Sequence, residues 1–146
     1  MARVLGLDVG DKRIGLALSD SGGVLASPLT IIKRTAESED IEAILKVAKE
    51  SEIERIIVGL PRLMNGDVGP QAQKVQTFVE ALRSYTDIPI EFRDERLTTV
   101  TAVRLKQETS SKKKNRKIRY DAMAAAVILQ DYLEEKAMGK KTEIDL

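Results

Sequence analysis

The stretch Arg3-Val4-Leu5-Gly6-Leu7-Asp8 decides the expected fold, because it is typical of a strand at the centre of a sheet. It is apolar without strict alternation, as in strands that are buried on both faces. Gly10-Asp11-Lys12 indicates a tight turn, and Arg13–Ser19 is a second apolar run that predicts a hairpin. The strand closes on Asp8, and a buried carboxylate is costly unless it has a partner.

A third strand follows this hairpin in what looks like an antiparallel meander, and the pattern then changes to alternating helices and strands. Gly22-Gly23 marks a turn, and a third strand is expected over Val24–Lys33. Because Pro28 has no amide to donate, this strand is expected either to lie at an edge of the sheet or to be broken. The remaining periodicities predict four helices and two strands. The first helix is capped by Ser38 and has the apolar stripe Ile41, Ile44, Leu45 and Ala48. The other elements are a strand Glu54–Gly59, a helix from Pro70 to Leu82, a strand Ile88–Arg93, a helix from Thr98 or Thr99 to Leu105, and a last helix from Arg119 to Lys136. This order is typical of an α/β fold with a mixed sheet and helices on its faces. One allowed arrangement places the first strand between the hairpin and the fourth strand.

Length and composition limit the classes of protein and site. The 146 residues predict one domain over residues 1–138, with residues 139–146 as a frayed tail. The absence of cysteine and histidine excludes disulfides, thiolate metal sites and a serine–histidine hydrolase, so a bound metal needs oxygen ligands, which favours Mg²⁺ or Mn²⁺. Because the sequence has neither a membrane-spanning apolar stretch nor an apolar signal core, and cysteine-free chains fit a reducing compartment, a cytoplasmic protein that does not enter a membrane is expected.

Positive charge is concentrated in one short segment. The net charge is only +1, but Lys112, Lys113, Lys114, Arg116, Lys117 and Arg119 place six positive charges in eight residues, so the rest of the chain sums to −5. A mobile loop of this composition could bind the phosphates of a nucleic acid without sequence preference, and Lys12 and Arg13 could contact the same nucleic-acid backbone. The alternatives are a solvated charge run and a local pair with Asp11.

Three acidic residues border apolar segments that are far apart in the chain. Asp8 ends the first strand, Glu95 follows the fifth strand, and Asp121 opens the apolar run Ala122–Leu129. Strand ends of an open α/β sheet meet at one rim, where the three carboxylates could lie together. Two carboxylates about 5 Å apart repel by roughly 3 kcal/mol at an effective dielectric constant of 20, so a shared site favours divalent cations.

Each acid also has a plain alternative explanation. Asp8 could be a turn aspartate, Glu95 a member of a surface ion pair, and Asp121 a helix N-terminal acid. Taken one at a time, these alternatives are favoured; it is the joint placement on one rim that points to a site.

Four blocks of sequence, in order along nearly the whole chain, resemble the YqgF (RuvX) family, relatives of the RuvC Holliday junction resolvases. The blocks are Leu5–Gly15, Val58-Gly59-Leu60-Pro61 with Asn65-Gly66, Asp94–Thr99, and Asp121–Gln130. The resemblance implies an RNase H-like fold with a five-stranded mixed sheet of order 3-2-1-4-5, whose first three strands are antiparallel. It also implies a nuclease that acts in maturation of the small-subunit (16S) ribosomal RNA precursor or on branched DNA.

The same resemblance implies Asp8, Glu95 and Asp121 as catalytic and metal-binding residues, with two Mg²⁺ or Mn²⁺ ions. RuvC-type enzymes carry a further acid three residues after the last aspartate, where this chain has Ala124, which puts strong junction resolution in doubt. Asp94 could replace this missing acid, but the alternation of side chains along a strand is expected to point it away from Glu95.

Three hypotheses therefore stand side by side. The first is a metal-dependent nuclease, and the second is a binding module that docks on precursor RNA or a pre-ribosomal particle with little or no catalysis. The third is an actin-like ATPase fragment, which ranks last because the chain has no P-loop and is too short for the second half of that fold.

Overall fold

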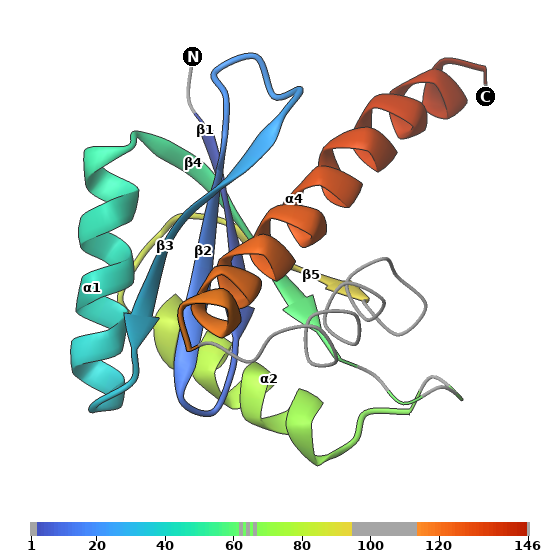
Figure 1. Cartoon of the computed structure of the whole chain (residues 1–146). Coiled ribbons are helices and arrows are strands. Elements are labelled where there is room, and N and C mark those ends of the chain that lie inside the picture. Colours follow the sequence, from blue (N-terminus) through green and yellow to red (C-terminus); the bar gives the residue numbers. More distant parts are fainter. Residues whose placement is uncertain (1–2, 62, 64, 66, 95–113, 146) are drawn as a thin grey trace.

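The computed structural model describes residues 3–61, 63, 65, 67–94 and 114–145, with the side chains of 114–121 and 139–145 left out of the description. Its centre is a five-stranded sheet of order β3-β2-β1-β4-β5 (Figure 1). The strands are β1 (Arg3–Val9), β2 (Arg13–Ser19), β3 (Ala26–Lys33), β4 (Ile53–Leu60) and β5 (Ile90–Asp94). β1, β2 and β3 pair antiparallel, and β4 and β5 run parallel to β1. The predicted fold class and strand order are confirmed.

Helices cover both faces of this sheet. α1 (Glu37–Glu50) and α2 (Pro70–Arg83) pack on one face, and α4 (Lys114–Asp145) crosses the other (Figure 1). Alternation along β1 separates the two cores, because Leu5, Leu7 and Val9 belong to the cluster with α1 and α2, whereas Val4 belongs to the cluster with α4. The helix predicted from Pro70 to Leu82 is confirmed, and α2 packs on the sheet through its buried residues Ala72, Val75, Phe78, Val79 and Leu82.

α4 and β1 approach each other closely at Gly6. A Cβ atom on this residue would lie 2.9 Å from Leu129 Cβ and 3.0 Å from the carbonyl oxygen of Ala125. Glycine is therefore required by the space between strand and helix, and this contact fixes how deeply α4 sits on the sheet.

β3 forms one edge of the sheet, as Pro28 predicts. Its register with β2 shifts between Leu16 and Ala17, which pair with Thr30 and Pro28, so Leu29 is an extra residue in the ladder. The strand is mostly exposed along its length.

Some predicted boundaries are wrong. Ser38 does not cap α1, whose N-cap is Ala36 without a side-chain cap bond; the buried Asp40 instead accepts the Thr35 amide at 3.0 Å and fixes the entry of the helix. The last helix spans Lys114–Asp145 rather than Arg119–Lys136, because lysine and arginine are good helix formers and no glycine or proline interrupts residues 114–138. The helix predicted from Thr98 or Thr99 to Leu105 lies outside the described residues, and the single domain and the fraying of residues 139–146 stay predictions.

Over the described residues, no helix combines the length and the apolar character needed to cross a membrane.

Candidate functional site

Asp8 occupies the position that the sequence predicts, near the end of the central strand. It pairs with Gly15 of β2 and is only 8% exposed. Its neighbours Leu7 and Val9 belong to the core under α1 and α2, so alternation places Asp8 on the opposite face, which α4 covers. A carboxylate so deeply buried at the end of a central strand needs compensation by its surroundings.

The contacts between β1 and α4 show which part of the helix lies beside Asp8. Val4 lines one pocket with Tyr132 and Leu133, and Gly6 lies against Ala125 and Leu129. The helix therefore crosses the strand obliquely and in the opposite direction (Figure 1). Two strand residues advance about 6.8 Å, which corresponds to about 4.5 helical residues at 1.5 Å each. This progression predicts that Asp8 lies opposite the turn of α4 that contains Asp121.

The end of β5 lies on the same rim of the sheet. Leu7 pairs with Val58, and Val58 pairs with Phe92, so these three residues lie at the same height in the sheet. Asp8 and Arg93 each follow by one residue and therefore also lie at the same height. Two strand spacings separate their backbones by about 10 Å. Asp94 pairs with Leu60, which belongs to the core under α1 and α2, so alternation directs Asp94 away from the face of Asp8 and makes it a poor substitute ligand. Glu95, which follows directly, lies outside the described residues.

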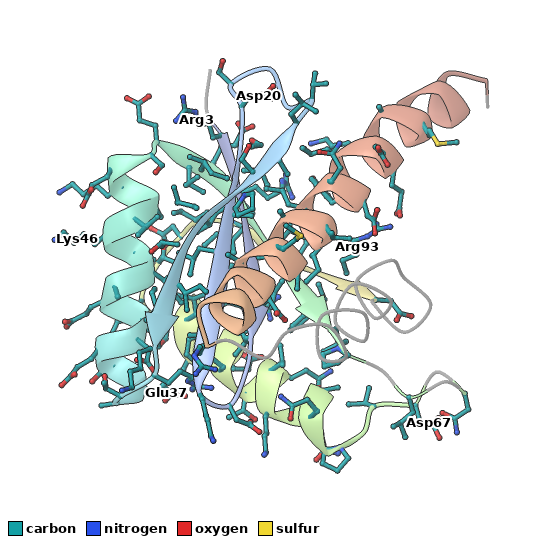
Figure 2. The ribbon with its side chains drawn as sticks, in the orientation of Figure 1. Arg3, Asp20, Glu37, Lys46, Asp67 and Arg93 are labelled. Carbon is teal, nitrogen blue, oxygen red and sulfur yellow. The ribbon has the colours of Figure 1, made fainter. Side chains whose placement is uncertain are left out.

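Arg93 connects this rim to α4. Its guanidinium pairs with the Glu135 carboxylate, and Figure 2 shows Arg93 reaching toward the helix. Within the described residues its buried Nε atom has no hydrogen-bond partner. Burial raises the pKa of the nearby Asp131 carboxyl, and the positive charge of Arg93 partly offsets this rise. An ion cluster therefore links α4 with the strand that leads to Glu95.

The predicted basic residues fall into three groups. Lys12 is exposed in the turn between β1 and β2, and Arg13 is half-buried at the start of β2. Lys112 and Lys113 lie outside the described residues. The expectation of a mobile loop is wrong for the rest, because the backbone is helical at Lys114, Arg116, Lys117 and Arg119.

The helical backbone divides these four positions between two faces. Positions 114, 117 and 121 follow one another at spacings of three and four residues, so Lys114 and Lys117 share a face of α4 with Asp121. Arg116 and Arg119 lie on a different face. Two of the four basic residues in the helix, Lys114 and Lys117, therefore lie on the same helix face as the candidate ligand Asp121.

Sequence reasoning missed a partly buried network behind the turn that follows Asp8. Arg34 donates to the Gly10 carbonyl at 3.0 Å and to the Asp40 carboxylate at 3.3 Å. Asp40, in the first turn of α1, is only 2% exposed. The signal was its position, because Asp40, Ile44 and Ala48 follow at intervals of four on the apolar stripe.

In the part of the chain that the structure describes, no three acidic side chains are close enough together to hold a metal ion. Of the three predicted ligands, only the Asp8 side chain belongs to that part.

Comparisons with known proteins identify the family of this chain. The family model described as "RuvX: Holliday junction resolvase" matches residues 2–135. A protein from Roseiflexus sp. (strain RS-1) named "Putative pre-16S rRNA nuclease" is 49% identical over 92% of this chain and 95% of its own length. A protein of the same name from Thermoanaerobacter pseudethanolicus is 50% identical over 92% of this chain and 97% of its own.

Solved structures show the same fold at low sequence identity. RuvC from Thermus thermophilus, in complex with a Holliday junction substrate, has a TM-score of 0.59 at 13% identity and covers 94% of this chain and 96% of that one. The fowlpox virus Holliday junction resolvase has a TM-score of 0.50 at 14% identity, over 91% and 98% of the two chains. These likenesses establish the RNase H-like fold of the resolvases. The family match over residues 2–135, together with relatives about half identical over nine-tenths of the chain, shows that this protein belongs to the RuvX family.

Proposed function

We propose that this protein is a divalent-metal-dependent nuclease that hydrolyses phosphodiester bonds in the precursor of 16S ribosomal RNA. The observation that carries the proposal is the buried carboxylate of Asp8 on the sheet face that α4 covers, opposite the expected level of Asp121. Relatives named as nucleases of this RNA precursor support the choice of substrate. The pre-ribosomal particle as a partner and the cytoplasm as location belong to the same proposal.

The donor chemistry of the chain fits a hard divalent cation. A sequence without histidine or cysteine offers only oxygen ligands, and Asp8 presents a carboxylate that is shielded from water. We assign Asp8, Glu95 and Asp121 as the residues that would hold two Mg²⁺ or Mn²⁺ ions. Such ions activate a water molecule as the nucleophile and stabilise the charge that develops on the leaving oxygen.

The side chains of the protein supply binding and orientation in this proposal. Asp8 is held rigidly because it belongs to a strand that is paired on both sides. Lys114 and Lys117, on the Asp121 face of α4, bind the phosphates that flank the scissile bond. Sequence-independent attraction for the nucleic acid comes also from Lys112, Lys113, Arg116 and Arg119. The residues of the turn after β1 that contact the nucleic-acid backbone are Lys12 and Arg13.

Ala124 favours the RNA precursor over a four-way DNA junction. It stands where RuvC-type enzymes carry a further acid, and it is fully buried in the apolar cluster between α4 and the sheet. The site therefore has three first-choice carboxylates and lacks the further acid, which weighs against strong junction resolution.

The test is a cleavage assay that compares the purified wild type with Asp8→Asn. The substrates are precursor 16S RNA and a four-way DNA junction, each with and without Mn²⁺. We expect Asp8→Asn to abolish metal-dependent cleavage of the RNA and to keep RNA affinity within a few fold, because the basic residues are unchanged. Cleavage by the purified variant at the wild-type rate would remove Asp8 from the reaction. RNA binding without cleavage by the wild type would instead leave a binding module.

A further inference from the structure

The turn between β1 and β2 is closed by its own backbone and follows Asp8 directly. The Gly10 amide donates to the Arg13 carbonyl at 2.8 Å. A Cβ atom on Gly10 would lie 2.9 Å from that same oxygen, so the turn has no room for a side chain there. A change in this turn would alter how Asp8 leaves the strand.

Arg34, the residue that directly follows β3, holds the turn at two points. The Arg34 amide donates to the Lys12 carbonyl at 2.9 Å, and its guanidinium donates to the Gly10 carbonyl at 3.0 Å. The guanidinium carbon lies 5.0 Å from the centre of the Phe78 ring, which supports its flat face. Arg34 thus joins the turn to α2 by contacts in three directions.

Asp40 holds the guanidinium in this orientation. One of its oxygens accepts from Arg34 Nε at 3.3 Å, and the other accepts the Thr35 amide at 3.0 Å. The side chain is buried in the first turn of α1, where the helix dipole also favours a negative charge. A buried carboxylate with two fixed donors makes a rigid support, and such hydrogen-bonded charge pairs are geometrically specific.

We propose that Arg34 is a positioning residue, which fixes the turn after β1 and thereby the geometry in which Asp8 binds divalent cations. The claim rests on the proposed function, because it assumes that Asp8 is a metal ligand. Arg34 itself does not contact the reacting atoms. Its effect passes through the Gly10 carbonyl and two residues of backbone.

The chain offers a matched control for this experiment. Arg83 also stacks on an aromatic ring, with its guanidinium carbon 5.6 Å from the centre of Phe92, and it donates to the Ile90 carbonyl at 3.1 Å. Both contacts are with β5, two strands away from β1, and the Phe92 ring lies on the sheet face opposite Asp8. Arg34→Met and Arg83→Met therefore remove the same kind of interaction, but only Arg34→Met removes a contact with the turn after β1.

Because Arg34→Met leaves the buried Asp40 charge without its cation and could prevent folding, Arg34→Met/Asp40→Asn is the second variant. The asparagine oxygen still accepts the Thr35 amide. Arg34→Lys serves as the conservative variant, because its ammonium restores a charge and a donor but not the planar fork.

Two measurements are made on the full chain. Hydrogen exchange reports the protection of the amides of residues 10–13, and titration with Mn²⁺ alone reports affinity without any turnover. We expect both Arg34→Met variants to lose protection in this turn and to bind Mn²⁺ about tenfold more weakly, as the loss of a charge-assisted hydrogen bond implies. Arg34→Lys should recover part of the affinity, and Arg83→Met should leave both quantities at the wild-type level.

The outcomes separate this inference from the function on which it rests. A wild type that binds no Mn²⁺ would overturn the proposed function, and the positioning role would fall with it. A wild type that binds Mn²⁺, together with an Arg34→Met/Asp40→Asn variant that binds it equally well, would overturn the positioning role alone. Equal losses of affinity in the Arg34 and Arg83 variants would show that the effect is general destabilisation.

Discussion

Gly6→Ala tests the close packing of α4 on the central strand. The new methyl group would lie 2.9 Å from Leu129 Cβ and 3.0 Å from the Ala125 carbonyl oxygen. Carbon atoms pack comfortably at about 3.5–4.0 Å, so the helix must withdraw by roughly 0.5–1 Å. The nearest atoms are a Cβ and a backbone oxygen, neither of which a change of rotamer can move aside.

The expected cost follows from two opposing effects. Overpacking of a core costs about 1–3 kcal/mol. Replacing glycine reduces the entropy of the unfolded chain and returns about 0.4–1 kcal/mol. We therefore expect a net destabilisation of about 1–2 kcal/mol, and at roughly 3–4 °C per kcal/mol for a domain of this size, a Tm that is lower by roughly 3–8 °C.

Thermal unfolding followed by circular dichroism measures this change, and Gly22→Ala is the matched control. A Cβ atom at Gly22 would meet only Val24 Cγ2, at 3.9 Å, which is ordinary contact, so its Tm should stay within about 1–2 °C of the wild type. Because α4 also carries Asp121, Gly6→Ala should weaken Mn²⁺ binding, whereas Gly22→Ala should not. A Gly6→Ala protein with an unchanged or raised Tm would refute the argument that glycine is needed for this helix to seat.

Two further predictions concern charge. Replacing Lys114 and Lys117 by alanine should reduce the slope of log affinity against log salt concentration by about 1.4 on single-stranded RNA, at about 0.7 per phosphate contact, as filter binding at several salt concentrations would show. Initial rates should show that this variant also cleaves more slowly than Arg116→Ala/Arg119→Ala. Equal effects of the two pairs would contradict the division of these residues between two faces of α4. Hydrogen bonds from the Val24 and Leu25 amides lower the pKa of Asp20, at the tip between β2 and β3 (Figure 2), so its stabilising effect is full above the ordinary aspartate pKa and is lost as the pH falls through the lowered value. Asp20→Ala should therefore lower the Tm at pH 7 and converge with the wild type in acid, and a gap that stays constant with pH would count against this account.

Strong local patterns made most of the sheet predictable. β2 begins and ends where its sequence predicts, because a glycine-containing turn and a polar tip bound an unbroken apolar run. The expected edge position of β3 followed from Pro28, since a central strand needs every amide. The strand order itself needed the resemblance to a family, because residue patterns left the arrangement of the sheet open.

Features that depend on long-range contacts were less accessible. The basic segment was expected to be a loop from its charge, although part of it continues α4, where lysine and arginine cost a helix little. The burial of Asp40 was not anticipated either, because it depends on the guanidinium of Arg34, which the Gly10 carbonyl and the Phe78 ring hold in place from distant parts of the chain. For the site, the sequence located Asp8 correctly at a buried strand end, and the pairing of Arg93 with Glu135 could not be anticipated from residues 42 positions apart.

The irregular edge strand has a consequence for how the protein behaves in a crowded cell. An exposed row of regularly spaced backbone donors and acceptors would recruit strands from other molecules and grow into fibrils. In β3 the imino acid at Pro28 removes a donor, and the additional Leu29 puts the neighbouring groups out of step. This border of the molecule is thereby protected against self-templated aggregation by two adjacent residues.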